Sequence, residues 1–267
     1  MEGLIGQGRT ADVFRYGESK VIKVFHHEFD WLAYEEYAKV KHIDSIGVPV
    51  PQVYDFVDND GKKGIVYEYV QGISMLNLMQ RNPFKVVQYA KRLADLHATI
   101  HKKTLPSLPN IKESLSAMIQ NVQSITQVEK DAIISYMNTL ADGYSLCHYD
   151  FHPDNVLLHK ANAKVIDWMT AGAGDPCADV CRTSVILNSN ALPPNASVMK
   201  RVLTNTFRKI FYRSYIHQYL AATDVTLQNV DKWLLPVAAA RLAEGIESET
   251  TYLNGIIAKK MSDYELS

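Results

Sequence analysis

The segment HYDFHPDN, residues 148–155, brings two histidines, two aspartates and an asparagine together within eight residues. Side chains of these types serve in metal sites, in hydrolytic relays and in phosphoryl transfer. In an extended strand His148, Asp150 and His152 would share one face, as metal ligands can. The following proline and the lack of another histidine cluster nearby weigh against a metal site. A hydrolytic relay would also need a serine or cysteine on a nucleophile elbow, and the sequence shows no such motif.

Phosphoryl transfer accounts for more of the residues. Asn155 follows Asp150 by five positions, which is the spacing of a kinase catalytic loop, and Asp167 follows Asn155 by twelve. The reaction needs one carboxylate that orients the acceptor hydroxyl and takes its proton. It also needs an amide oxygen and a second carboxylate that hold magnesium against the phosphates. The pattern therefore favours phosphoryl transfer over the other two kinds of chemistry.

A glycine-containing turn and a lysine precede this segment in the order that such a reaction requires. Gly6 and Gly8 lie between two short strand patterns, where glycines let the backbone approach a phosphate closely. Lys23 lies in the next strand pattern, VIKVF, and alternation places it on the same face as Val21 and Phe25. A plain hairpin turn is the alternative for the glycines, and a solvent-exposed sheet edge is the alternative for the lysine.

The apolar residues of segment 28–43 recur at helical spacing, and Glu36 falls within their arc. An acid on an apolar stripe needs a cation, and Lys23 is within reach if the helix packs back on the strand that precedes it. The neighbouring Glu35 points away from the stripe. An ordinary, partly exposed helix glutamate is the alternative for Glu36. The stripe consists of Phe29, Leu32, Ala33, Val40 and Ile43.

The chain changes character near residue 70. Strand patterns and one helix fill the residues before that point, including VPQVYDFV and KGIVYEYV. Helical periodicity dominates after it, with loops predicted at 102–112 and 188–197. The sequence therefore predicts an α+β fold with two domains. The first, residues 1–70, holds an antiparallel sheet with one main helix, and the second, residues 71–267, is mostly helical.

Composition narrows the function classes. A formal net charge of −1 and a pI of about 6.8 give no global field that would attract nucleic acid or an anionic membrane. The opening residues lack a secretory-signal pattern, and no apolar run approaches the roughly 20 residues of a membrane span. Three cysteines fit a reducing compartment. We therefore expect a cytoplasmic protein without a nucleic-acid or membrane partner, whose oligomeric state the sequence does not indicate.

Several motifs together resemble the aminoglycoside phosphotransferase and choline kinase family, whose fold is similar to that of protein kinases. HYDFHPDNVLL resembles the family's His-Gly-Asp-Leu-His-Pro-x-Asn-Ile-Leu loop. VIDWMTAGAGDPCADV resembles its Ile-Asp-Trp segment with the following Gly-Asp-Pro-x-x-Asp. YEYVQG is similar to its hinge between lobes, and LADLHATIH to its helix ending in Leu-His-x-Leu-His. The resemblance spans about residues 5–185.

The resemblance implies a two-lobed, protein-kinase-like fold and a role for each matching residue. Asp150 would be the catalytic carboxylate, and Asn155 and Asp167 would be the magnesium ligands. Lys23 would contact the ATP phosphates, and Glu36 would be its ion-pair partner. The implied cofactors are Mg²⁺ and ATP, with GTP as the alternative nucleotide.

The same resemblance implies the remaining nucleotide contacts. The turn with Gly6 and Gly8 would cover the phosphates, and backbone groups from Glu68 to Val70 would hold the adenine. The sequence departs from the family pattern at three positions, none of which removes a catalytic group. Ala11 replaces the third glycine of the loop, Tyr149 the usual glycine before the catalytic aspartate, and Asp154 a common glycine before Asn155.

The acceptor is expected to be a small, cationic alcohol. Residues 224–267 contain seven acids against four bases, and Glu244, Glu247 and Glu249 crowd one or two helical turns. Such a cluster would form an acidic wall that attracts a cation, so we expect Glu244 and Glu247 to bind an aminoglycoside-like or choline-like substrate. A solvated helix face is the alternative.

The predicted function is thus Mg·ATP-dependent transfer of the γ-phosphoryl group to a hydroxyl of a small molecule. One alternative is a nucleotide-binding regulatory protein without catalysis, although such a protein has no need of Asp150. A protein kinase is the other. The chain lacks an Ala-Pro-Glu segment, and the eight positions from Asp167 to Asp175 are too few for a long activation loop.

Overall fold

A computed structural model describes residues 2–59, 61–189 and 198–265. Residues 190–197 of the predicted loop lie outside this described part. The chain divides into two compact units. Unit 1 comprises Met1–Leu78 and Pro153–Thr170, and unit 2 comprises Met79–His152 and Ala171–Ser267. The division therefore differs from the predicted boundary at residue 70, because unit 1 extends further and includes a second, later segment.

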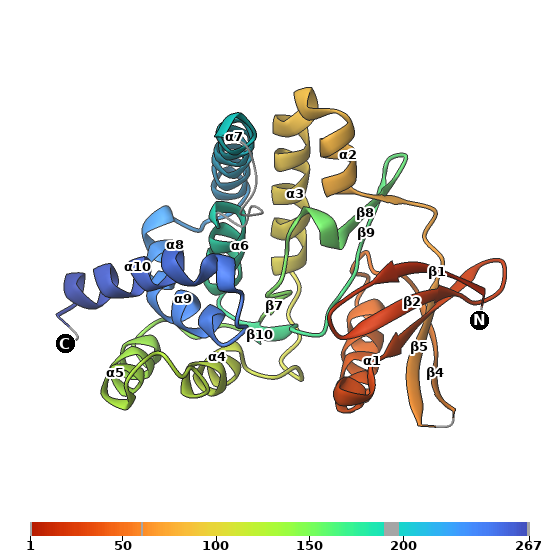
Figure 1. Cartoon of the computed structure of the whole chain (residues 1–267), viewed down its shortest axis with the longest axis horizontal. Coiled ribbons are helices and arrows are strands. Elements are labelled where there is room, and N and C mark those ends of the chain that lie inside the picture. Colours follow the sequence, from red (N-terminus) through yellow and green to blue (C-terminus); the bar gives the residue numbers. More distant parts are fainter. Residues whose placement is uncertain (1, 60, 190–197, 266–267) are drawn as a thin grey trace. The chain divides into compact units, whose positions relative to one another are not determined.

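Within unit 1, the described residues form a five-stranded antiparallel sheet in the order β1-β2-β3-β5-β4 (Figure 1). Short strand patterns rich in β-branched and aromatic residues account for these strands. The predicted N-terminal antiparallel sheet is thus confirmed. The strands are β1 (Glu2–Gln7), β2 (Ala11–Arg15), β3 (Lys20–Phe25), β4 (Val53–Asn59) and β5 (Lys62–Glu68).

Helix α1 (Asp30–Ser45) packs on this sheet after a short 3₁₀ turn (His27–Phe29). Its buried residues are Ala33, Glu36, Val40 and Ile43, so the predicted apolar stripe encloses Glu36. Ala33 forms a core cluster with Ala11, Phe25 and Ile65 of the sheet. Because side chains alternate along β3, Lys23 shares the face of Phe25 and is directed toward α1.

A second sheet of unit 1 has the order β6-β8-β9 and consists of β6 (Ile73–Ser74), β8 (Val156–His159) and β9 (Asn162–Val165). A 3₁₀ turn (Pro153–Asn155) leads into β8, and helix α2 (Met75–Arg81) follows β6. Val165 N donates to Pro49 O at 2.7 Å, which attaches the β8–β9 hairpin to the N-terminal part of the chain. The hairpin thereby carries Asn155 at its start and Asp167 just after its end.

Unit 2 is mostly helical, as predicted, and helices α3 and α7 pack along each other in it (Figure 1). A short antiparallel pair, β7 (Ser145–Cys147) with β10 (Gly172–Gly174), leads into α6. The helices are α3 (Val86–His101), α4 (Ile111–Gln120), α5 (Gln127–Asn138), α6 (Pro176–Asn188), α7 (Val198–Ala222), α8 (Leu227–Lys232), α9 (Leu234–Leu242) and α10 (Glu247–Asp263). A 3₁₀ turn (Pro83–Lys85) precedes α3. No helix in the described ranges combines the length and apolarity needed to cross a membrane.

Candidate active site

The predicted site residues belong to both units, and each group is described within its own unit. In unit 1 the ammonium group of Lys23 lies between two carboxylates. Its Nζ donates to Glu36 Oε1 and Oε2 at 2.9 and 2.8 Å and to Asp167 Oδ1 at 3.0 Å. Tyr67 Oη donates to Glu36 Oε1 at 3.1 Å and fixes that carboxylate further. Side chains from β3, from α1 and from the segment after β9 therefore meet at one point.

Burial and charge act in opposite directions on Lys23. Burial alone would lower the pKa of its ammonium group, but the carboxylates of Glu36 and Asp167 outweigh that effect and raise the pKa above its ordinary value. The Glu36 side chain is 2% exposed, whereas the Asp167 side chain is 43% exposed. Lys23 is therefore a permanent cation held by a buried partner, beside a carboxylate that solvent can reach.

Asn155 and Asp167 are brought together by the β8–β9 hairpin, because Ile166 N donates to Asn155 O at 3.0 Å. Asp167 has a φ of 65°, a left-handed conformation that is uncommon outside glycine and frequent at functional sites. Lys39 of α1 donates to Met169 O at 2.8 Å and ties the segment after Asp167 to the helix. Carboxylate and amide oxygens are the ligands that Mg²⁺ prefers, so these two residues fit a magnesium site.

The glycine turn joins β1 to β2 closely. Gly8 N donates to Ala11 O at 2.9 Å, and a Cβ atom at Gly8 would lie 3.0 Å from that oxygen. The described glycines with positive φ are Gly17, Gly47, Gly61 and Gly245. Gly6 and Gly8 are not among them, so a need for positive φ does not explain the two glycines of this turn. The absence of a side chain at Gly8 keeps the backbone of the turn accessible.

The segment after β5 uses two of its N–H groups inside unit 1. Glu68 N donates to Gln52 O, and Tyr69 N donates to Ser19 O, both at 2.8 Å. The next N–H group, that of Val70, has no backbone acceptor among the described residues. A ligand that bound at this stretch could therefore accept a hydrogen bond from Val70 N without displacing a backbone contact.

In unit 2, helix α6 holds the loop 148–152. Asp179 accepts the backbone N–H groups of His148 and Tyr149 at 2.6 and 3.0 Å. Thr183, one turn later, donates from Oγ1 to a carbonyl of the same loop at 2.8 Å. Tyr149 has a φ of 62°, which explains why the family pattern has glycine at this position. The loop adopts this conformation here because α6 binds its backbone.

Two histidines of α3 complete the surroundings of Asp179. The Nε2 atoms of His97 and His101 lie 3.1 and 3.2 Å from Asp179 Oδ2, and their Nδ1 atoms lie 2.7 Å from the hydroxyls of Tyr215 and Tyr219. The three side chains are of metal-ligand types. His101 can nevertheless donate from Nε2 to the carboxylate, both imidazoles can accept at Nδ1 from the tyrosine hydroxyls, and the carboxylate also accepts two backbone N–H groups. We therefore interpret the cluster as a structural brace for the loop.

Asp150 places its carboxylate among cationic or protonatable groups. His152 Nε2 lies 3.5 Å from Asp150 Oδ2, and Arg182 Nη2 lies 3.9 Å from Oδ1. The backbone N–H of Asp150 donates to His148 Nδ1 at 3.2 Å. Burial alone would raise the pKa of Asp150, but His152, Arg182 and His148 hold that pKa well below its ordinary value. The carboxylate is therefore ionised at neutral pH and can accept a hydrogen bond from a hydroxyl.

The predicted acidic cluster is largely neutralised by arginines. Glu244 accepts hydrogen bonds from Arg182 Nη2 and from Arg241 Nη1, the latter at 2.7 Å. Arg241 also donates to both carboxylate oxygens of Glu249, at 2.6 and 3.0 Å. Glu247 is exposed at the start of α10. Both oxygens of Glu244 are thus engaged, which removes the main basis for expecting Glu244 to bind a cationic acceptor directly.

Sequence reasoning missed Arg182 and Arg241. One signal for Arg182 exists, because it follows Asp179 by three positions and so lies on the same side of α6. Its partner Glu244 is 62 residues away in the chain, and such a pairing leaves no local pattern. The contact forms because α6 packs against α9, and Glu244 lies just after the end of α9.

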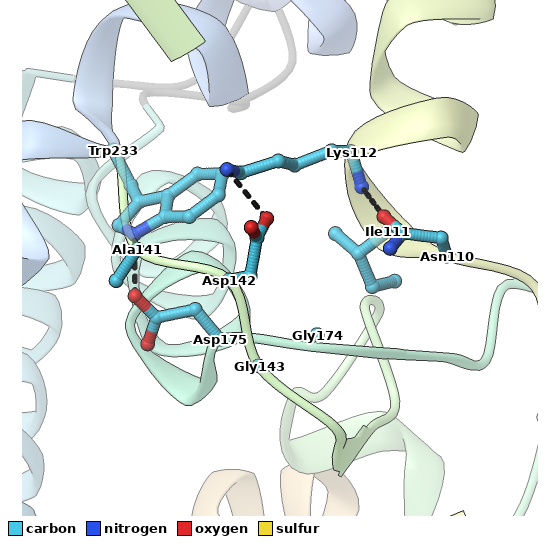
Figure 2. Close-up of a pocket in the computed structure, with 9 residues that line it drawn as sticks. All are labelled: Asn110, Ile111, Lys112, Ala141, Asp142, Gly143, Gly174, Asp175 and Trp233. Carbon is cyan, nitrogen blue, oxygen red and sulfur yellow. Dashed lines mark hydrogen bonds and ion pairs between the residues drawn. The ribbon is translucent and has the colours of Figure 1, made fainter. Parts of the chain in front are cut away.

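A small pocket in unit 2 lies where α6 begins (Figure 2). Asp175 caps the helix by accepting from Cys177 N at 2.8 Å, and it also accepts from Trp233 Nε1 at 3.0 Å. Lys112 Nζ lies 2.7 Å from Asp142 Oδ1 on the other side of the pocket. Because these polar groups satisfy one another, we assign no ligand to this pocket. The contacts of Asp175 anchor the start of α6.

Comparison with solved structures supports the fold. An aminoglycoside-3'-phosphotransferase of type VIII has a TM-score of 0.61 at 16% identity, over 90% of this chain and 91% of that one. An amicoumacin kinase in complex with AMP-PNP, Ca²⁺ and Ami has a TM-score of 0.62 at 15% identity, over 98% and 88%. A choline/ethanolamine kinase family protein from Mesorhizobium loti gives 0.57 at 16% identity, over 96% and 86%. At such identities these structures show the fold alone.

The sequence comparisons address the family. A search among curated proteins gives no match. The profile of the phosphotransferase enzyme family, APH, matches residues 4–228. The matched range includes the glycine turn, Lys23, Glu36 and the whole segment from Asp150 to Asp167, and it covers most of the sequence. The chain therefore belongs to the APH phosphotransferase enzyme family.

Proposed function

We propose that this protein transfers the γ-phosphoryl group of Mg·ATP to a hydroxyl of a small molecule. The observation that carries the proposal is the cluster in unit 1, where Lys23 contacts both Glu36 and Asp167 and where one hairpin carries Asn155 beside Asp167. A fixed cation next to two oxygen ligands for a metal is what the binding of a nucleoside triphosphate requires. Family membership and the AMP-PNP and Ca²⁺ bound to a structural neighbour point the same way.

The residues of unit 1 would bind the nucleotide. Lys23 would contact the phosphates, with Glu36 keeping its ammonium group in place, and Asn155 and Asp167 would hold the magnesium. A bound magnesium ion supplies positive charge that offsets the charge developing on the transferred phosphoryl group. The backbone of the Gly6–Gly8 turn would lie over the phosphates, and the N–H group of Val70 would donate to the base.

Asp150 would receive the acceptor. Its ionised carboxylate can accept a hydrogen bond from the acceptor hydroxyl, orient that oxygen and take its proton as the phosphoryl group is transferred. The low pKa of Asp150 makes it a weak base, so most of its contribution would come from orientation. This division agrees with a reaction in which positioning and charge neutralisation supply most of the catalysis.

The proposed acceptor class rests on the structural neighbours and on one exposed glutamate. A small molecule is favoured because the chain is similar in fold to an aminoglycoside kinase, a choline kinase family protein and an amicoumacin kinase. The predicted cationic character now rests on Glu247, since Glu244 is paired with two arginines. We keep a cationic alcohol as the first class to test, and ATP as the first nucleotide with GTP beside it.

The test is ADP release from Mg·ATP across aminoglycosides, choline, ethanolamine, thiosugars, macrolides and homoserine. Stimulation by one acceptor is expected, with Asp150→Asn lowering kcat by at least about 100-fold. An Asp150→Asn variant with wild-type turnover would refute the proposed role of this residue. If the wild-type protein binds Mg·ATP but no acceptor stimulates ADP release, a nucleotide-binding protein without catalysis becomes the better description. Stimulation by peptides alone would favour a protein kinase.

A further inference from the structure

Arg182 occupies an unusual place for a buried arginine. Arg182 lies on α6, next to Thr183 and three positions after Asp179. Asp179 and Thr183 hold the backbone of the loop 148–152. Its side chain is 2% exposed, and its Nη2 atom lies 3.9 Å from Asp150 Oδ1. The same helix therefore binds the loop backbone with two side chains and approaches the partly buried carboxylate of Asp150 with a third.

The guanidinium group of Arg182 is itself held on two sides. Glu244 accepts a hydrogen bond from Nη2, and Cζ lies 5.4 Å from the centre of the Tyr149 ring. Glu244 in turn pairs with Arg241, whose guanidinium group binds both carboxylate oxygens of Glu249. Alternating charges thus run from α10 through α9 to Arg182 and end at Asp150.

Stability alone is a poor explanation for this arrangement. Arg182 Nε and Nη1 are buried and have no hydrogen-bond partner among the described residues. The hydroxyl of Tyr149 is buried without such a partner too, and that residue has a positive φ. Buried donors that lack acceptors lower stability, and apolar residues of similar size often replace buried ion pairs without loss. A buried arginine beside Asp150, with donors that lack acceptors, therefore points to a functional role for this side chain.

We propose that Arg182 is a positioning residue that fixes the orientation of the Asp150 carboxylate toward the acceptor hydroxyl. Glu244 fixes the guanidinium group and so acts on Asp150 only through Arg182. This inference rests on the proposed function, in which Asp150 receives the acceptor. It also gives Glu244 a role different from the direct acceptor binding that its sequence position suggested.

The experiment compares Arg182→Met, Arg182→Lys, Glu244→Gln and the double variant Arg182→Met/Glu244→Gln. The probe is Mg·ATP with the acceptor that gives ADP release in the panel above, and Asp150→Asn is the benchmark. Arg182→Met should lower kcat roughly 10- to 100-fold, because a displacement of about 1 Å at the reacting group can cost that much. The dissociation constant for Mg·ATP should stay unchanged, and the urea midpoint of the double variant, which removes both partners of the ion pair, should not fall.

The other variants test whether Glu244 acts on Asp150 through Arg182. Arg182→Lys should have a higher kcat than Arg182→Met, because lysine restores the positive charge but not the planar guanidinium group. Glu244→Gln should lower kcat in the wild-type background and have no further effect once Arg182 is methionine. Arg213→Met, which changes an exposed arginine of α7, controls for the loss of a positive charge and should leave kcat as it is.

Two results would overturn the inference while leaving the proposed function intact. One is wild-type kcat in Arg182→Met when Asp150→Asn is inactive. The other is a loss of kcat in the double variant that goes with a lower urea midpoint or weaker Mg·ATP binding, which would make Arg182 a structural residue. Wild-type protein that releases no ADP with any acceptor would instead refute the proposed function, and the role of Arg182 with it.

Discussion

At the scale of single residues, Glu36 determines where the Lys23 ammonium group lies. Its side chain is 2% exposed and both of its carboxylate oxygens accept from Lys23 Nζ, whereas Glu35, one position earlier on α1, is exposed. The two glutamates therefore offer the same chemical change at a buried and at an exposed position.

The Lys23–Glu36 pair gives the first prediction. Glu36→Gln removes the buried negative charge that keeps the Lys23 ammonium group in place, so Lys23 should contact Asp167 alone and bind phosphates less well. We expect the KM for Mg·ATP to rise about tenfold, equivalent to about 1.4 kcal/mol. The thermal midpoint should also fall, because the buried cation loses a partner. Steady-state kinetics and calorimetry measure the two effects.

Glu35→Gln is the matched control, because it makes the same chemical change one position away on the exposed side of α1. It should leave both the KM and the thermal midpoint as in the wild type. Equal effects of the two substitutions would mean that the general charge of α1, and not the contact with Lys23, matters for nucleotide binding.

At the scale of elements, the sequence predicted the longer pieces better than the short ones. The strands of the N-terminal sheet and helix α1 follow from alternation and helical period, and α1 is observed two residues later than expected, at Asp30–Ser45. Strands β6 and β10, of two and three residues, are too short to carry a periodic signal. Helix α4 begins at Ile111, so its first two residues fall within the predicted loop 102–112.

The packing of α3 against α7 gives the second prediction. His97 of α3 is fully buried, and its Nδ1 lies 2.7 Å from the Tyr215 hydroxyl of α7. Burial, with a smaller effect of His101, lowers the pKa of His97 from 6.5 to about 4. Between these pH values the unfolded chain binds a proton that the folded chain excludes. Stability should therefore decrease as the pH falls from 6.5 to 4, by up to about 3 kcal/mol from this residue.

Urea unfolding at a series of pH values measures this effect. His97→Gln should be less stable than the wild type at neutral pH, because a buried contact is lost, yet its stability should depend less steeply on pH between 4 and 6.5. His42→Gln changes an exposed histidine of α1 and should keep the wild-type slope. A wild-type slope in His97→Gln would show that other groups cause the acid sensitivity.

At the scale of the whole molecule, the predicted boundary at residue 70 differs from the division of the chain into two units. Composition changes near residue 70, so a boundary at that point was the natural expectation. The structure instead assigns Pro153–Thr170 to unit 1, since the β8–β9 hairpin pairs with β6 and bonds to Pro49. Such a return of the chain depends on long-range strand pairing, which leaves no mark in local composition. As a result, Asn155 and Asp167 belong to the unit of Lys23, while Asp150 belongs to unit 2.

This division predicts that nucleotide binding and catalysis can be separated by substitution. The residues proposed to bind Mg·ATP all lie in unit 1, so Asp150→Asn should keep the stabilisation that the nucleotide gives to the folded chain. At 100 times the dissociation constant that stabilisation is about 2.7 kcal/mol. Asp167→Ala should lose most of it, because both a magnesium ligand and a partner of Lys23 are removed. Thermal unfolding of the full chain, with ADP and either Mg²⁺ or EDTA, measures the effect.

One outcome would contradict the assignment of nucleotide binding to unit 1 alone. If Asp150→Asn abolished the nucleotide-dependent shift as fully as Asp167→Ala does, Asp150 would itself take part in nucleotide binding.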